Sequence, residues 1–221
     1  PTTIILATVS TLVAVLLAIP LGILAAIYQN SLIDNLSRVV AMIGVSMPNF
    51  WQGLLNILIF AVYLGWLPSS GMATLGTAGG AGDVAKHMVM PVLVLATSMA
   101  GTNIRYIRSA MLEILQQDYL RTAKAKGIGR FLVINKHALR NALIPIITVI
   151  GMEIPVLFGG QVIIEQVFSW PGLGLMTMSA ITNRDYPVIM GVCLLSAIVV
   201  LAANLITDIL YALADPTIQL K

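Results

Sequence analysis

The sequence predicts an all-α membrane protein, a polytopic bundle of five transmembrane helices with one short helix outside the membrane. Of its 221 residues, 58% are hydrophobic and only 10% are charged, whereas a soluble domain carries about 25% charged residues. Several uncharged stretches are long enough to cross a bilayer, which takes roughly 20 residues of helix. Charged residues gather between these stretches, and six of the twelve Lys and Arg residues lie within residues 118–145.

Five apolar stretches are expected to span the membrane. At about 1.5 Å per residue, the second is too long for one straight span, and Met47-Pro48-Asn49 is expected to break it. Arg105 and Arg108 should carry the third helix into water. The expected spans are residues 3–28, 39–67, 87–104, 142–164 and 187–207.

The connections between the spans have turn or cap signals. Asp34 is expected to cap a helix that starts near Asn35. Residues 68–86 are rich in Gly and Ser and predict a flexible outside loop. Between the last two spans, a Pro-Gly turn within residues 168–174 precedes Leu175–Thr182, which is expected to form a short helix that dips back into the membrane.

The distribution of basic residues predicts the orientation. If residues 118–145 lie inside, then every Lys and Arg except Lys86 and Arg184 is on the inner side. Such a bias is typical of cytoplasmic loops. The net charge of +3 therefore reflects topology rather than binding of nucleic acid, and the carboxyl terminus is expected inside.

Residues 118–145 are the longest charged interval and predict a short helix in the water phase. Asp118 can accept hydrogen bonds from the free N–H groups of a helix start. Gly127 can adopt the left-handed conformation that ends a helix. We therefore expect a helix over Tyr119–Lys126, a tight turn, and a second helix that enters the membrane. The interval is either a docking surface for another protein or simply a positively charged inside loop.

Polar residues inside the second and fourth spans allow two interpretations. Ser46, Asn49, Gln52 and Asn56 recur at helical spacing and should share one face. Such residues usually bond to neighbouring helices, and lining a substrate path is the alternative. Glu153 lies near the middle of the fourth span. An acid there should face the bundle interior or water, where it either holds two helices together or lines the path.

The 118–145 interval also resembles the cytoplasmic EAA coupling loop of ABC-importer permeases. Arg121-Thr122-Ala123 stands where that loop has Glu-Ala-Ala, Gly127 is its Gly, and Leu139-Arg140-Asn141 follows His137 where Leu-Pro-Asn is usual. The departures resemble the oligopeptide/dipeptide/nickel branch, in particular its first permease subunit. The segments EQVFSWPGLG and DPTIQLK resemble the same branch.

The resemblance implies a type I ABC-importer permease fold and a set of partners. The coupling helix would sit in a groove of an ATPase subunit. The implied partners are a second, non-identical permease subunit, two ATPase subunits and an extracytoplasmic solute-binding protein, besides membrane lipids. The implied docking residues are Tyr119, Arg121, Thr122, Ala123, Lys126 and Gly127. Arg184 and Asp185 are expected at the outer mouth, where they either contact the binding protein, together with Trp170, or form a solvated pair.

The sequence lacks the motifs of an enzyme. No Gly-x-x-x-x-Gly-Lys-Ser/Thr segment is present to cradle ATP phosphates, and there are no paired carboxylates or nucleophile elbow. His87 and His137 are isolated, and the scattered Met residues are typical of packing, so no metal site is expected. The chain should therefore hold no cofactor, with ATP and Mg bound by partner ATPase subunits.

Together these observations predict a non-catalytic permease subunit in a prokaryotic cytoplasmic membrane. Residues 1–221 are expected to form one transmembrane domain, a fragment that lacks an N-terminal span and outside region of the family. The expected function is import of di- or oligopeptides by alternating access. Nickel chelates or glutathione are alternative substrates. An ion-coupled secondary transporter and a structural subunit without a pathway are the rival interpretations. The candidate path residues are Asn49, Gln52, Asn56 and Glu153.

Overall fold

The computed structural model is built from helices of very different length. It describes residues 1–74, 76, 80–129, 132–139, 141–142, 146–147 and 161–214. Helix α1 (Thr2–Ile27) is followed by α2 (Leu32–Ser46), α3 (Asn49–Asn56), the π-helix η1 (Ile57–Tyr63) and the long helix α4 (Ala81–Leu115). Because a helix satisfies its own backbone hydrogen bonds, helices with mostly apolar side chains can lie within a bilayer.

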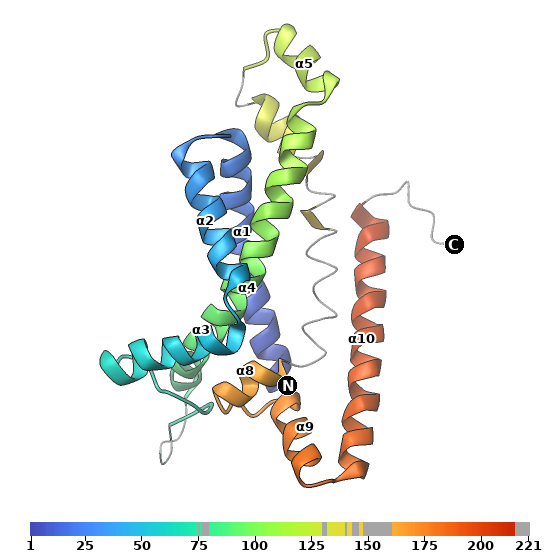
Figure 1. Cartoon of the computed structure of the whole chain (residues 1–221). Helices are drawn as coiled ribbons and strands as arrows, with labels where there is room; N and C mark the ends of the chain where they lie inside the picture. The colour runs from blue at the N-terminus through green and yellow to red at the C-terminus, as the bar shows by residue number, and fades with distance from the viewer. Residues whose placement is uncertain are drawn as a thin grey trace.

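The second half of the chain contains shorter elements and one more long helix. Helix α5 (Asp118–Ala125) follows α4 after two residues, and the π-helix η2 (Val133–Ala138) comes next. Near the carboxyl end, α8 (Val162–Val167) and α9 (Leu173–Thr182) lead into α10 (Tyr186–Ala214). Figure 1 shows α5 and the α1–α2 turn at one end of the molecule, and residue 1, α8 and α9 at the other. We call these the α5 end and the opposite end.

Helix α4 is the central element, against which α1 and α2 both pack. Glycines allow the helices to approach closely, because a Cβ at Gly101 would lie 2.6 Å from the carbonyl oxygen of Ala41. A Cβ at Gly44 would lie 2.4 Å from that of Thr97, and one at Gly22 would lie 2.7 Å from the Ile107 side chain. Small residues at helix crossings are the usual means of packing in a membrane.

The predicted break in the second span is confirmed. Helices α2 and α3 meet at an angle of 100°, with Met47 and Pro48 between them, because proline cannot donate the next backbone hydrogen bond. The bend separates Ser46 from Asn49, Gln52 and Asn56. The expectation that all four share one helical face is therefore wrong for Ser46.

Two predicted helix starts are wrong by several residues. Helix α2 begins at Leu32, and the Ser31 side chain, not Asp34, caps it by accepting from the Asp34 N–H at 3.4 Å. Helix α4 begins at Ala81, so Lys86 and the residues around it are helical rather than part of the loop. The N–H and hydroxyl of Thr74 both donate to the Asp83 carboxylate and tie the preceding loop to the first turn of α4.

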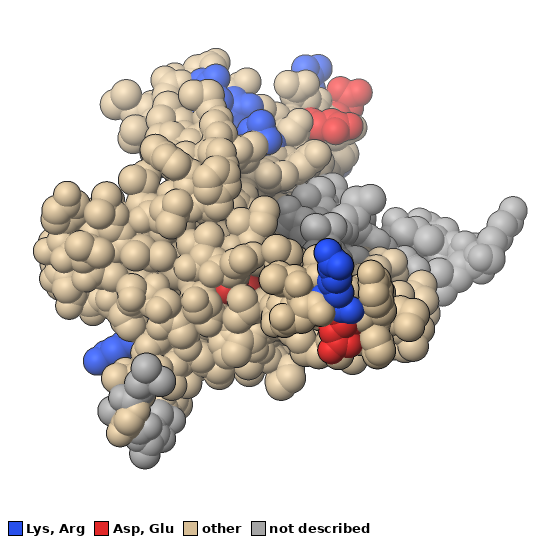
Figure 2. Space-filling model, turned by 60° about the horizontal axis from the view of Figure 1, so that its bottom comes forward, with Lys and Arg blue, Asp and Glu red and all other residues tan. Residues whose placement is uncertain are grey.

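The spans agree with expectation as far as they are described. Within the described residues, α1, α4 and residues 186–205 of α10 are long and apolar enough to cross a membrane, and the bent pair over residues 32–63 can add a fourth span. Most of the expected span 142–164 lies outside the described residues. The surface in Figure 2 is mostly uncharged, with the charged side chains in small groups, as expected for a chain that contacts lipid and other membrane helices.

The close crossing of α2 and α4 yields a test with a matched control. Gly101→Ala should lower the free energy of unfolding by about 1–3 kcal/mol, because the new methyl group collides with backbone. Gly191→Ala in α10 should be neutral or slightly stabilising, since nothing lies within 4 Å of a Cβ there. Thermal unfolding of the detergent-purified chains measures both. Equal midpoints for the two variants would contradict the proposed crossing.

Candidate functional site

The expected docking helix is present as α5, and its end follows the expected chemistry. Gly127 has φ +79, a backbone conformation that is unfavourable for residues with a side chain. The N–H of Ile128 bonds to the carbonyl of Ala123 at 3.2 Å, which is the hydrogen bond of a Schellman motif at a helix end. At the start, Asp118 is the first helical residue rather than the cap before it. Two residues therefore connect α4 to α5, and a turn at Gly127 ends α5.

One face of α5 is packed against the rest of the chain. Leu120 is 1% exposed and Ala123 is 9% exposed, and both belong to a buried apolar cluster that includes Met111 of α4 and Val133 of η2. The turn after α5 joins this cluster, since Ile128 packs against it. Helix α5 is therefore held by both α4 and the segment that follows it, so a force on α5 reaches both.

The other face of α5 is exposed and polar. The Tyr119 hydroxyl accepts a hydrogen bond from the Asn141 side-chain amide at 2.8 Å. The Thr122 hydroxyl donates to the Asp118 carbonyl at 3.0 Å, and Arg121 lies 3.7 Å from the Asp118 carboxylate in a solvent-exposed pair. Pairs of this kind contribute little to stability. These side chains can therefore give up their present contacts and bind a partner at a small cost in free energy.

Most of the expected docking residues lie on this exposed face, and one does not. Ala123 points into the buried cluster, so its side chain cannot contact an ATPase in this arrangement. Helical spacing explains the difference, because Ala123 lies three residues after the buried Leu120 and shares its face. The exposed members of the expected set are Tyr119, Arg121, Thr122, Lys126 and Gly127.

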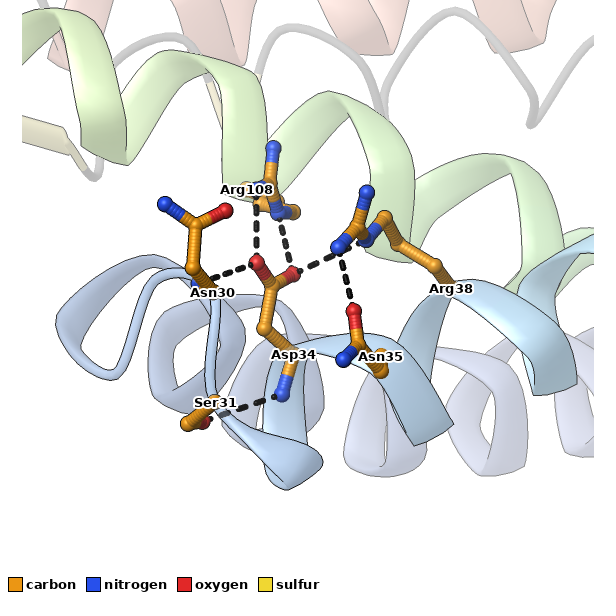
Figure 3. A network of polar contacts seen from close by, with 6 residues as sticks. All are labelled: Asn30, Ser31, Asp34, Asn35, Arg38 and Arg108. Carbon is orange, nitrogen blue, oxygen red and sulfur yellow. Dashed lines mark hydrogen bonds and ion pairs between the residues drawn. The ribbon is translucent and has the colours of Figure 1, made fainter.

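A buried ion pair joins α2 to α4 near the α5 end (Figure 3). The Asp34 carboxylate is fully buried and accepts two hydrogen bonds from Arg108, one from Nε at 2.7 Å and one from a terminal nitrogen at 2.9 Å. The N–H of Asn30, a residue at φ 64, donates to the same carboxylate at 2.8 Å. The Nε of Arg38 lies 3.4 Å from it. This bidentate arrangement fixes both helices and the turn before α2.

A second buried carboxylate organises the opposite end. Glu165 of α8 is fully buried, and its carboxylate accepts from the Thr3 hydroxyl at 2.7 Å. Its other oxygen accepts from the N–H groups of Gly174 and Leu175 at 2.6 and 3.0 Å. These are free donors in the first turn of α9, which a negative charge stabilises. Glu165 thereby ties α1, α8 and α9 together.

The same contact explains the glycines of the WPGLG segment. A Cβ at Gly172 would lie 2.2 Å from the Glu165 carboxylate, and a Cβ at Gly174 would lie 2.6 Å from the Val162 backbone. Neither position therefore has room for a larger residue.

The expected binding-protein contacts are divided by burial. Trp170 is fully buried, and its indole N–H donates to the Thr2 carbonyl at 3.2 Å. Its side chain is therefore not at the surface, and its expected contact with a binding protein is wrong for this structure. Arg184 and Asp185 are exposed in the turn between α9 and α10, where Asp185 accepts from the Val188 N–H at 3.2 Å. Their role stays a prediction.

The candidate path residues are only partly brought together. Gln52 donates to the Thr97 hydroxyl at 2.6 Å, as expected of a polar residue that bonds to a neighbouring helix. It borders a cavity of about 190 Å³ between α1, α2, α3 and α4, whose lining is otherwise almost wholly apolar. Asn49 and Asn56 are half-buried on α3. Glu153 lies outside the described residues.

Residues 18–220 match the family model described as "Binding-protein-dependent transport system inner membrane component". The chain belongs to this family. A family member of this kind is a membrane subunit, which agrees with the apolar helices described above.

Three curated relatives are closely similar. The oligopeptide transport system permease protein AppB of Bacillus subtilis is 48% identical over 99% of this chain and 69% of its own length. The di/tripeptide transport system permease protein DppB of Pseudomonas aeruginosa is 42% identical over 90% and 64%. The glutathione transport system permease protein GsiC of Escherichia coli is 39% identical over 94% and 65%. The chain thus spans about two thirds of the length of these relatives.

The fold itself is that of a known transporter. A chain from inward-facing structures of the MetNI methionine ABC transporter superposes with a TM-score of 0.74, covering 97% of this chain and 93% of that one. The two share 19% sequence identity, so the likeness concerns the fold alone. The predicted type I ABC-importer permease fold is confirmed.

The two buried carboxylates were not singled out by the sequence. Asp34 was interpreted as a cap, and Glu165 as a residue just beyond a span. Their partners Arg108 and Thr3 are 74 and 162 residues away in sequence, beyond the reach of local patterns. The available signal was an acidic residue beside an otherwise uncharged span, which demands a partner.

The Asp34–Arg108 pair is testable by a double-mutant cycle. Asp34→Asn should cost about 1–3 kcal/mol of folding free energy, because a charged group loses its partner in a buried site. Arg108→Gln should cost a similar amount, and the double variant should cost less than the sum of the two. Denaturant titration of the purified chain in detergent gives the three values. Additive values would contradict a direct interaction.

Proposed function

We propose that this chain is a membrane-spanning subunit of an ATP-driven importer of peptides, in which α5 receives an ATPase subunit. The observation that carries the proposal is the division of α5 into a packed face and a polar, exposed face. Family membership supports it, since the family is one of binding-protein-dependent transport systems. Hydrolysis of ATP is assigned to partner subunits, because the chain carries no phosphate-binding Gly-Lys segment.

Peptides are the proposed substrate class on the strength of the relatives. The names of the two relatives with the highest identity quoted above refer to oligopeptide and di/tripeptide transport. Glutathione is the second candidate, favoured by the similarity to the glutathione permease. A purified complex reconstituted in vesicles with its binding protein would separate the two by direct uptake of each labelled substrate.

The proposed mechanism is alternating access driven from α5. A partner can shift the chain between two states only if it contacts α5 differently in each. Since α5 shares a buried cluster with α4 and η2, its displacement would tilt the helices on both sides of it. The Tyr119–Asn141 hydrogen bond adds a polar link between α5 and the segment that leads to the next span.

The proposed assembly contains a second membrane subunit, two ATPase subunits and a solute-binding protein outside the membrane. The α5 end would face the cytoplasm, because every Lys and Arg except Lys86 and Arg184 lies toward it in the sequence-based topology. Exposed Arg184 and Asp185 at the opposite end would then face the binding protein. Asn49, Gln52, Asn56 and Glu153 remain proposed path residues, of which Gln52 also bonds to a neighbouring helix.

Crosslinking at neighbouring positions of α5 tests the docking. In the assembled transporter, Thr122→Cys should crosslink to a cysteine in the ATPase groove, and the yield should change on addition of ATP. Ala123→Cys is the matched control, since its side chain is buried within the chain and should give little product. Crosslinks that ignore nucleotide would contradict the mechanism, and equal yields at both positions would contradict the orientation of α5.

A further inference from the structure

Helix α4 marks where the membrane begins on the α5 side. Residues 87–104 contain no Asp, Glu, Lys or Arg, and they make about 27 Å of helix at 1.5 Å per residue. That length matches the hydrocarbon core of a bilayer, about 30 Å. Arg105 therefore lies at the edge of the apolar region, and Arg108 lies one turn further out. This is the level of lipid phosphate groups.

The packing of α2 on α4 brings Arg38 to the same level. The two helices are antiparallel, with Asp34 bonded to Arg108 and Ala41 against Gly101. Arg38 lies between Asp34 and Ala41, about one turn from Asp34, so it is level with Arg105. Figure 3 shows Arg38 and Arg108 converging on the same carboxylate.

Two guanidinium groups, those of Arg38 and Arg108, share one buried carboxylate, and Arg105 lies at the same level. Asp34 is fully buried, so its negative charge is not presented to the surroundings. The Arg38 side chain is 50% exposed and that of Arg108 is 20% exposed, while Arg105 is exposed. Asn35 also accepts from Arg38 and restrains it. The cluster presents excess positive charge, with two of its side chains held in place before any ligand arrives.

Apolar side chains continue from this cluster toward the membrane centre. Met42 is four residues after Arg38, so it lies on the same face of α2 one turn deeper. It is 61% exposed, and Val45, in the next turn and near Gly101, is 40% exposed. A ligand that bridges the cluster and this surface must have an anionic head and an apolar tail.

We propose that Arg38, Arg105 and Arg108 bind the phosphate headgroup of an anionic phospholipid, whose acyl chain lies along Met42 and Val45. Arginine suits this task because its planar fork can donate two hydrogen bonds to a phosphate. Basic groups at the ends of membrane helices are typical sites for such lipids. Bound lipid would bridge α2 and α4 beside the Asp34–Arg108 pair.

The test compares two double variants with the same loss of charge. Arg38→Gln with Arg105→Gln removes two cations from the cluster and leaves the Asp34–Arg108 pair intact. Lys86→Gln with Arg184→Gln removes two exposed cations from the opposite end. Both are made in the assembled transporter, reconstituted in nanodiscs of phosphatidylcholine with or without phosphatidylglycerol. Native mass spectrometry counts retained phosphatidylglycerol, and thermal unfolding measures its effect.

The expected result is specific to the cluster. The parent and the Lys86/Arg184 variant should retain phosphatidylglycerol and gain thermal stability from it. The Arg38/Arg105 variant should bind it at least tenfold more weakly and lose that gain. Equal loss in both variants would mean nonspecific attraction, and no loss in either would mean no site. Unchanged lipid retention with weaker association of the second membrane subunit would assign the cluster to a protein interface. Each of these last three results would overturn the proposal.

Discussion

The close approach of α1 and α2 to α4 is the constraint on which the rest of the structure depends. Lipid tails are as apolar as the helices, so burial of apolar surface provides little force between them. Contact must then come from shape, and Gly22, Gly44 and Gly101 provide it by leaving room for neighbouring backbone or side chains. Once α1, α2 and α4 are joined, the end of α4 becomes a rigid support from which α5 projects.

Two buried carboxylates add polar contacts to the close packing of the helices. At the α5 end, Asp34 holds Arg108 and the backbone of Asn30. At the opposite end, Glu165 holds Thr3 and the first turn of α9. Each carboxylate receives several donors, which offsets the cost of burying a charge. Asp34 therefore joins α2 to α4 at the α5 end, and Glu165 joins α1 to α8 and α9 at the opposite end.

The sequence predicted the features that depend on local chemistry. Absence of charge located the described spans, Pro48 located the bend, and Gly127 located the end of α5. The sequence-based predictions failed where the role of a residue depends on partners far away in the chain. Whether Asp34 caps a helix or binds Arg108 depends on an element 74 residues away. Trp170 was expected to contact a binding protein, but it is fully buried and its indole bonds to Thr2 at the start of α1. The burial of Ala123 was within reach, because the helical period places it beside Leu120.

The Thr3–Glu165 contact sets an order of assembly. The ribosome makes α1 long before α8, since 162 residues separate the two partners, and chains fold from the amino terminus as they emerge. The Asp34–Arg108 clasp needs only residues up to α4, so it can close while synthesis continues. The opposite end of α1 must wait for α8 and α9. Until then the Thr3 hydroxyl lacks the partners, Glu165 and the Leu173 N–H, that it has in the folded chain.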